Sequence, residues 1–125
     1  MIGSYLILHY GKPRLKKAVA SIYPQVDKIV ILYSPAPSQG FQTDLKCPDT
    51  REELLNEVSE FMDKIEWIDG SWSVEGEHND AHAQYLKDCE WIVRFDADEV
   101  FSEGSVKYYI ELAKTKTAHI FRVPF

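Results

Sequence analysis

The sequence predicts a three-layer α/β/α fold in which helices cover both faces of a mostly parallel β-sheet. Apolar runs of strand length alternate along the chain with segments whose apolar residues recur at helical spacing. Several of the strand-length runs are apolar on both faces, which is typical of strands buried between two layers of helices. No internal repeat, low-complexity segment or linker interrupts this alternation. We therefore expect a single domain over residues 1–125.

The first strand and helix lie near the N-terminus. Residues 5–8 form an apolar run that ends at His9-Tyr10-Gly11, and Pro13 stands where the first helical residue is expected. The helix that follows has one apolar face and stops at Pro24. The residues of this face are Leu15, Ala18, Val19 and Ile22.

The second strand is predicted over residues 29–33. Residues 34–48 contain three prolines and one glycine, so they are predicted to form an irregular loop that is long enough to suggest a role in binding. The second helix begins after Asp49, which together with Glu52 resembles a capping box, and its apolar spacing continues to Ile65.

Three further strands complete the predicted sheet. The third strand covers residues 66–68, and a loop over residues 71–79 leads to the third helix. The fourth strand covers residues 91–95 and the fifth covers residues 118–125. The third helix presents Tyr85, Leu86 and Cys89 to the core, and the fourth, after a cap at Ser102, presents Val106, Tyr109, Ile110 and Ala113.

The apolar character of each run predicts its place in the sheet. The runs over residues 5–8, 29–33 and 91–95 are apolar on both faces, so we expect them to be the central strands. The run over residues 118–125 is also apolar, but no helix follows to cover it. We therefore expect this strand to be buried by self-association, which would make the protein a homo-oligomer.

Composition and charge exclude several classes of partner. The chain has 20 acidic and 14 basic residues and a net charge of -6, so it offers no broad attraction to nucleic acid or anionic lipid. The longest apolar run, over residues 29–33, is far shorter than the roughly 20 residues of a membrane-spanning helix. The N-terminus lacks the basic region of a secretory signal. We expect a cytoplasmic protein with no membrane span.

The predicted fold also indicates where a ligand binds. In parallel α/β sheets, ligands bind beyond the carboxyl ends of the strands, where the strand order reverses. The first strand ends at His9-Tyr10-Gly11, and the fourth ends at Asp96-Ala97-Asp98-Glu99. We expect these two runs to meet at the binding site.

The acidic run Asp96-Ala97-Asp98-Glu99 is the strongest chemical indication in the sequence. At the end of a strand, Asp96 and Asp98 face the same side about 6.6 Å apart, a span that one cation can bridge. Without a cation the two carboxylates repel each other by about 3 kcal/mol. The position after a buried strand favours a divalent metal ion with phosphate oxygens as further ligands. The alternative is an acidic loop whose aspartates only accept backbone hydrogen bonds.

Three segments carry a resemblance to a known family. They are Ser4-Tyr5-Leu6-Ile7-Leu8-His9-Tyr10, Ser21-Ile22-Tyr23-Pro24-Gln25-Val26-Asp27-Lys28-Ile29-Val30-Ile31, and Trp91-Ile92-Val93-Arg94-Phe95-Asp96-Ala97-Asp98-Glu99. Together they resemble the nucleotide-binding half of a family two glycosyltransferase, over essentially the whole chain. The resemblance implies a Rossmann-like GT-A fold, a nucleotide-diphospho-sugar donor, and a Mn or Mg ion that bridges the diphosphate to the acidic run. The implied activity is transfer of the sugar to an unknown acceptor.

The resemblance also implies roles for individual residues. Asp98 would hold the metal ion, while Asp96 would face the ribose or donor sugar and serve as a second metal ligand. His9 and Tyr10 would border the nucleoside. Family members usually have an aspartate that reads the base near the position of Ser34, and we place Ser34 among the nucleotide-sugar-binding residues.

The chain ends where the acceptor-binding half of this family begins. We therefore interpret it as the N-terminal part of a longer GT-A domain, and no general base for the acceptor hydroxyl is identified. The alternative function is a catalytically silent nucleotide-sugar binding module or fragment. A nucleotidyltransferase is the closest enzyme rival, but it would carry a glycine- and basic-rich loop after the first strand, which this chain lacks.

Other polar residues have more than one interpretation. His78 and His82 lie one helical turn apart and could bind zinc, contact a diphosphate or begin a polar helix. Trp72 could stack on a base or sugar, or cover the core. The basic contact that the family carries at the start of the third helix is missing here or comes from elsewhere. The basic residues early in the first helix form a solvated face or touch phosphate; they are Lys12, Arg14, Lys16 and Lys17.

Overall fold

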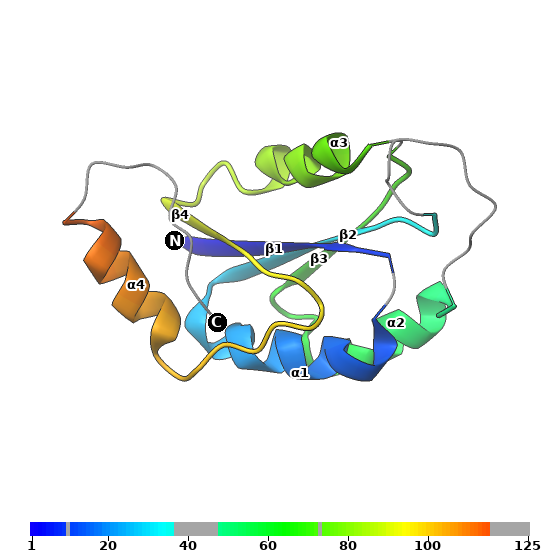
Figure 1. The fold of residues 1–125 in the computed structure, drawn as a ribbon, viewed down its shortest axis with the longest axis horizontal. Coiled ribbons are helices and arrows are strands. Elements are labelled where there is room, and N and C mark those ends of the chain that lie inside the picture. The colour runs from blue at the N-terminus through cyan, green and yellow to red at the C-terminus, as the bar shows by residue number, and fades with distance from the viewer. Residues whose placement is uncertain (10, 37–47, 73, 116–125) are drawn as a thin grey trace.

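Four parallel strands form the sheet of the computed structural model, which describes residues 1–9, 11–36, 48–72 and 74–115. The strands are β1 (Ile2–Leu8), β2 (Lys28–Tyr33), β3 (Ile65–Asp69) and β4 (Trp91–Arg94). Their order is β3-β2-β1-β4, so the chain builds outward on one side of β1 and then crosses to the other (Figure 1). The predicted α/β alternation around a parallel sheet is confirmed, and it is compatible with a Rossmann-like fold.

Helices cover both faces of this sheet (Figure 1). α1 (Lys12–Ile22), α2 (Arg51–Glu57) and α4 (Ser105–Ala113) lie on one face, and α3 (Glu75–Asp80) lies on the other, followed by the short 3-10 helix η3 (Ala81–Tyr85). A larger core lies between the sheet and α1, α2 and α4, and a smaller core lies between the sheet and the segment that contains α3 and η3. The larger core buries Leu6, Leu15, Ile31, Leu54 and Phe95, and the smaller one buries Tyr5, Val30, Leu32 and Leu86.

The register of the strands brings the ends of β1 and β4 to one edge of the sheet. Tyr5, in the middle of β1, pairs with Arg94 at the end of β4. The next residue, Phe95, donates a hydrogen bond of 3.1 Å from its N–H to the Tyr5 carbonyl. The residues that follow β4 therefore run beside the last residues of β1, as the sequence predicts for the ligand site.

The prediction that residues 91–95 form a central strand, covered on both sides, is wrong for the described part of the chain. Among the described strands β4 pairs with β1 alone and lies at the edge of the sheet. Trp91 and Val93 pack against the larger core, whereas Ile92 is 41% exposed and Arg94 is also exposed. The reason is that α3 and η3 pack over β1 and β2, so no described helix covers the outer face of β4.

Three predicted helices differ from the structure. The fourth begins at Ser105 with Gly104 as its N-cap, so the cap predicted at Ser102 is wrong. The second is shorter than predicted, because α2 ends at Glu57 and Ile65 already begins β3. The third lies earlier than predicted, since α3 falls largely within residues 71–79, which were expected to form a loop. α3 has no apolar side chain and buries only that of His78, so no apolar spacing marks this helix in the sequence. The residues predicted for its buried side lie at or after the end of η3.

Some predictions lie outside the described residues. These are the fifth strand over residues 118–125, the self-association that depends on it, and the contact of Tyr10 with a nucleoside. In the part of the chain that the structure describes, no helix has both the length and the apolar character needed to cross a membrane.

Candidate functional site

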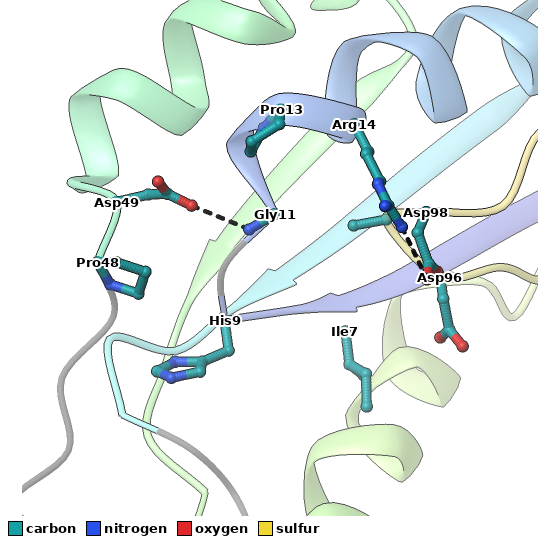
Figure 2. A pocket seen from close by; sticks show the side chains of 10 residues that line it. Ile7, His9, Gly11, Pro13, Arg14, Pro48, Asp49, Asp96 and Asp98 are labelled. Carbon is teal, nitrogen blue, oxygen red and sulfur yellow. Dashed lines mark hydrogen bonds and ion pairs between the residues drawn. The ribbon is translucent and has the colours of Figure 1, made fainter.

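A pocket of about 610 Å³ opens at the carboxyl ends of β1 and β4 (Figure 2). Its wall comes from the end of β1 and the turn after it, the first turn of α1, the residues just before α2, and the residues after β4. The two runs that the sequence predicts to meet at the site, after the first and the fourth strand, thus line the same pocket. The lining residues are Ile7, His9, Gly11, Pro13, Arg14, Pro48, Asp49, Asp96, Ala97 and Asp98.

The carboxylates of the acidic run after β4 have different surroundings. Asp96 and Asp98 line the pocket with side chains that are 52% and 59% exposed. Glu99 turns back toward the chain, where its Oε2 accepts a 2.8 Å hydrogen bond from the Asp96 N–H, and burial raises the pKa of its carboxyl. Glu99 therefore accepts a backbone hydrogen bond, the role that the alternative interpretation gave to the aspartates, whereas the carboxylates of Asp96 and Asp98 face the solvent.

Each of the two exposed aspartates lies near an arginine. Arg14 Nη1 lies 3.9 Å from Asp98 Oδ2, and Arg94 Nη2 lies 3.9 Å from Asp96 Oδ1. Arg94 is shared, since the same nitrogen lies 3.5 Å from Glu75 Oε1. Long contacts between exposed charges are weak in water, so a stronger partner can replace them.

Asp96 and Asp98 supply the kind of ligand that Mg²⁺ and Mn²⁺ prefer. Magnesium is usually bound by one or two carboxylates together with substrate phosphates and water. Within the described ranges, no group of three or more His, Cys, Asp or Glu side chains is arranged to hold a metal ion. Two carboxylates supply only part of the ligand set of such an ion, so phosphate oxygens and water would have to supply the rest.

His9 and Ser34, both predicted at the nucleotide site, meet where β1 and β2 end. The Nδ1–H of His9 donates a hydrogen bond of 3.1 Å to the Ser34 carbonyl, which orients the imidazole ring. Ser34 itself is buried, and its hydroxyl donates to the Ala36 carbonyl at 2.7 Å. His9 thus lines the pocket directly, whereas Ser34 lies behind it and positions its ring.

Asp49 is a pocket residue whose role the sequence does not reveal. It was predicted to cap the second helix, but that prediction is wrong: Thr50 Oγ1 accepts the capping bond of α2, at 3.1 Å from the Glu53 N–H. The Asp49 carboxylate instead caps α1, accepting hydrogen bonds from the N–H groups of Lys12 at 3.0 Å and Gly11 at 2.9 Å. These two hydrogen bonds lower the pKa of Asp49, and the bond from Lys12 has the larger effect.

Replacing Asp49 with alanine should lower the free energy of unfolding by about 1 kcal/mol at pH 7, the usual cost of losing a helix cap. Folding lowers the pKa of Asp49, so its carboxylate adds to the free energy of unfolding at pH values above the ordinary pKa of 3.8. This addition is lost as the pH falls from 3.8 through the lower pKa of the folded state. Urea unfolding at pH 7 and pH 3 measures the change, with the exposed Asp88→Ala as control. An equal loss from Asp49→Ala at both pH values would contradict the assignment.

The two histidines considered as zinc ligands belong to α3 and η3, on the face of the sheet away from α1, α2 and α4. His78 is buried, its Nε2–H donates a hydrogen bond of 2.7 Å to the Leu32 carbonyl, and its ring stacks on Trp72. Burial lowers the pKa of His78. The ring of His82 stacks on Tyr5 with centroids 3.9 Å apart. Both imidazoles therefore pack this face, and Trp72 covers the smaller core, which is one of the two roles predicted for it.

No protein-family model matches the chain, and searches of curated proteins and of solved structures find no match. The resemblance to family two glycosyltransferases is therefore one of sequence motifs. The structure establishes an α/β fold with a parallel sheet and a pocket where two of its strands end. The chemistry of that pocket is the basis for a functional assignment.

Proposed function

We propose that this chain binds a nucleotide-diphospho-sugar at the ends of β1 and β4 and belongs to a metal-dependent glycosyltransferase that passes the sugar to an acceptor. The observation that carries the proposal is the pair of half-exposed carboxylates, Asp96 and Asp98, in a pocket of about 610 Å³. Small-molecule sites usually have volumes of about 300–1,000 Å³. The same pocket contains His9, whose ring is held by the Ser34 carbonyl, and in this proposal the ring borders the nucleoside.

Charge is the reason for including a divalent cation. The protein carries a net charge of -6, and a diphosphate adds further negative charge. Three carboxylates, those of Asp49, Asp96 and Asp98, line the pocket, so a diphosphate alone would be repelled. Asp98, with Asp96 as the second ligand, would hold Mn²⁺ or Mg²⁺, which would neutralise the negative charge of the two carboxylates.

The proposed reaction breaks the bond between the sugar and the diphosphate and forms one between the sugar and an acceptor hydroxyl, whose proton passes to a base from outside the described pocket. Negative charge develops on the leaving diphosphate. A divalent cation stabilises such charge when bound. Asp98 and Asp96 would hold the cation, and His9, which the Ser34 carbonyl positions, would orient the nucleoside. In the proposed scheme these residues bind and align the donor, and the acceptor approaches from outside the pocket.

A nucleotide-sugar binding module without turnover is the second candidate. It is favoured because each of the three carboxylates that line the described pocket already has another role. Two of them are assigned to the metal ion, and the third, that of Asp49, accepts hydrogen bonds from the α1 backbone. None of the three is therefore assigned as the base that activates an acceptor hydroxyl.

Titration calorimetry with uridine diphosphate and guanosine diphosphate tests the binding function. At least one of them should bind about tenfold or more tightly in Mn²⁺ than in EDTA, because the cation removes the local repulsion. Equal affinity in the chelator would rule out the proposed metal site. Release of free nucleotide from uridine- or guanosine-diphosphate glucose then separates an active enzyme from a binding module.

A further inference from the structure

Arg14 lies in the first turn of α1 and extends toward the residues after β4 (Figure 2). Its Nη1 lies 3.9 Å from Asp98 Oδ2, and its side chain is 73% exposed. A separation of 3.9 Å is too long for a hydrogen bond. The guanidinium is therefore attracted to Asp98 without being fixed by it, and it can change partners.

Two other basic residues early in α1 already have close partners, and Arg94 beside Asp96 is shared with Glu75 at 3.5 Å. Lys12 and Lys16 form ion pairs of 3.1 and 2.8 Å with Glu53 and a glutamate after α2. The first N–H groups of α1 donate to the Asp49 carboxylate, so this helix end is not open to a phosphate. Among the described residues that line the pocket, Arg14 is the only lysine or arginine.

We propose that Arg14 binds the phosphate oxygens of the diphosphate, and that it leaves Asp98 for them when Asp98 engages the metal ion. This inference rests on the function proposed above. A cation on Asp98 satisfies that carboxylate and repels the guanidinium, while the diphosphate offers a new anion in the same pocket. The planar guanidinium can donate two parallel hydrogen bonds to one phosphate. Asp98 is thus balanced by Arg14 in the free protein and by the metal ion in the complex.

The variant Arg14→Gln should change two affinities in opposite directions. Removing the positive charge beside Asp98 should tighten the binding of Mn²⁺ alone by about two- to fivefold, the range of an exposed ion pair. In the presence of Mn²⁺, the affinity for uridine or guanosine diphosphate should fall by about tenfold or more, because a hydrogen bond between charged groups is lost. Calorimetry measures both affinities. A merely destabilised pocket would weaken both.

Two control variants test whether the position of the positive charge and the planar guanidinium group matter. Lys17→Gln removes the same charge from an exposed residue of α1 that does not line the pocket, so both affinities should stay near those of the unmodified protein. Arg14→Lys keeps the charge beside Asp98 but loses the planar guanidinium. Its affinity for Mn²⁺ alone should be unchanged, and its diphosphate affinity should fall less than that of Arg14→Gln.

The possible outcomes separate this inference from the proposed function. Opposite shifts in Arg14→Gln that are absent from Lys17→Gln support the exchange of partners. If the unmodified protein binds a diphosphate only with Mn²⁺, but Arg14→Gln leaves both affinities unchanged or lowers both, the role of Arg14 is wrong and the proposed function stands. If the unmodified protein binds neither Mn²⁺ nor a diphosphate, both are wrong.

Discussion

Replacing Asp98 with asparagine should remove the manganese-dependent part of the nucleotide affinity. The change preserves the shape of the side chain but removes the charge that attracts the cation, and metal sites for Mg²⁺ rely on such carboxylates. Loss of a group that only supports a metal ligand costs about 10- to 100-fold in metal affinity, so loss of the ligand itself should cost at least as much. Calorimetry in Mn²⁺ and in EDTA should give equal affinities for this variant.

Glu103→Gln is the matched control for Asp98→Asn. It removes one negative charge from an exposed residue that also follows β4 but does not line the pocket. Its affinity for the nucleotide in Mn²⁺ should remain within about twofold of the unmodified value, because solvent screens a charge at that position. If Asp98→Asn binds as tightly as the unmodified protein in Mn²⁺, the acidic run is only structural and the proposed function loses its main support.

The acidic residues around the pocket show how neighbours decide what a carboxylate can do. Asp49 is held by two backbone N–H groups of the β1–α1 turn, and Glu99 by the N–H of Asp96. Within the described part of the chain, the carboxylates of Asp96 and Asp98 have only long contacts, each with an arginine. The first two carboxylates are therefore part of the local backbone structure, whereas the last two remain available to a cation.

The elements that the sequence predicts best are those whose determinants are local. Pro13 and an apolar stripe on one face place α1 at Lys12–Ile22, and this helix ends before Pro24, as predicted. β1 and β2 are buried between two cores, so their continuous apolar character reflects their environment. The meeting of the residues after β1 and β4 was predictable too, because parallel strands end at the same edge of a sheet.

The features that sequence patterns missed depend on neighbours distant in the chain. Residues 91–95 are apolar except for Arg94, but the position of α3 leaves the side of β4 that carries Ile92 and Arg94 exposed. The role of Asp49 depends on partners that lie 37 and 38 residues earlier in the sequence. The turn whose N–H groups bind the Asp49 carboxylate contains Gly11, and its φ of 134° is readily adopted only by glycine. Neither a strand run nor a capping pattern contains this information.

Phe95→Ala should lower the free energy of unfolding by about 3–5 kcal/mol, the usual cost of truncating a buried phenylalanine. Phe95 is fully buried in the larger core, and its ring packs edge-on against Phe101 with centroids 6.3 Å apart. Small domains have a total stability of about 5–15 kcal/mol, so this variant should be close to unfolding at 37 °C. Urea unfolding followed by circular dichroism measures the loss.

Ile92→Ala, in the strand that directly precedes Phe95, is the control for this loss. Ile92 is 41% exposed on the outer face of β4, so its truncation leaves little cavity and should cost less than about 1 kcal/mol. Phe95→Leu keeps much of the buried volume, so it should lose less stability than Phe95→Ala. It should also retain nucleotide binding, because a buried side chain at this position still anchors the neighbouring Asp96. If Phe95→Ala and Ile92→Ala cost the same, β4 does not pack with one face on the core. The acidic run would then lack the rigid anchor that places it beside the end of β1.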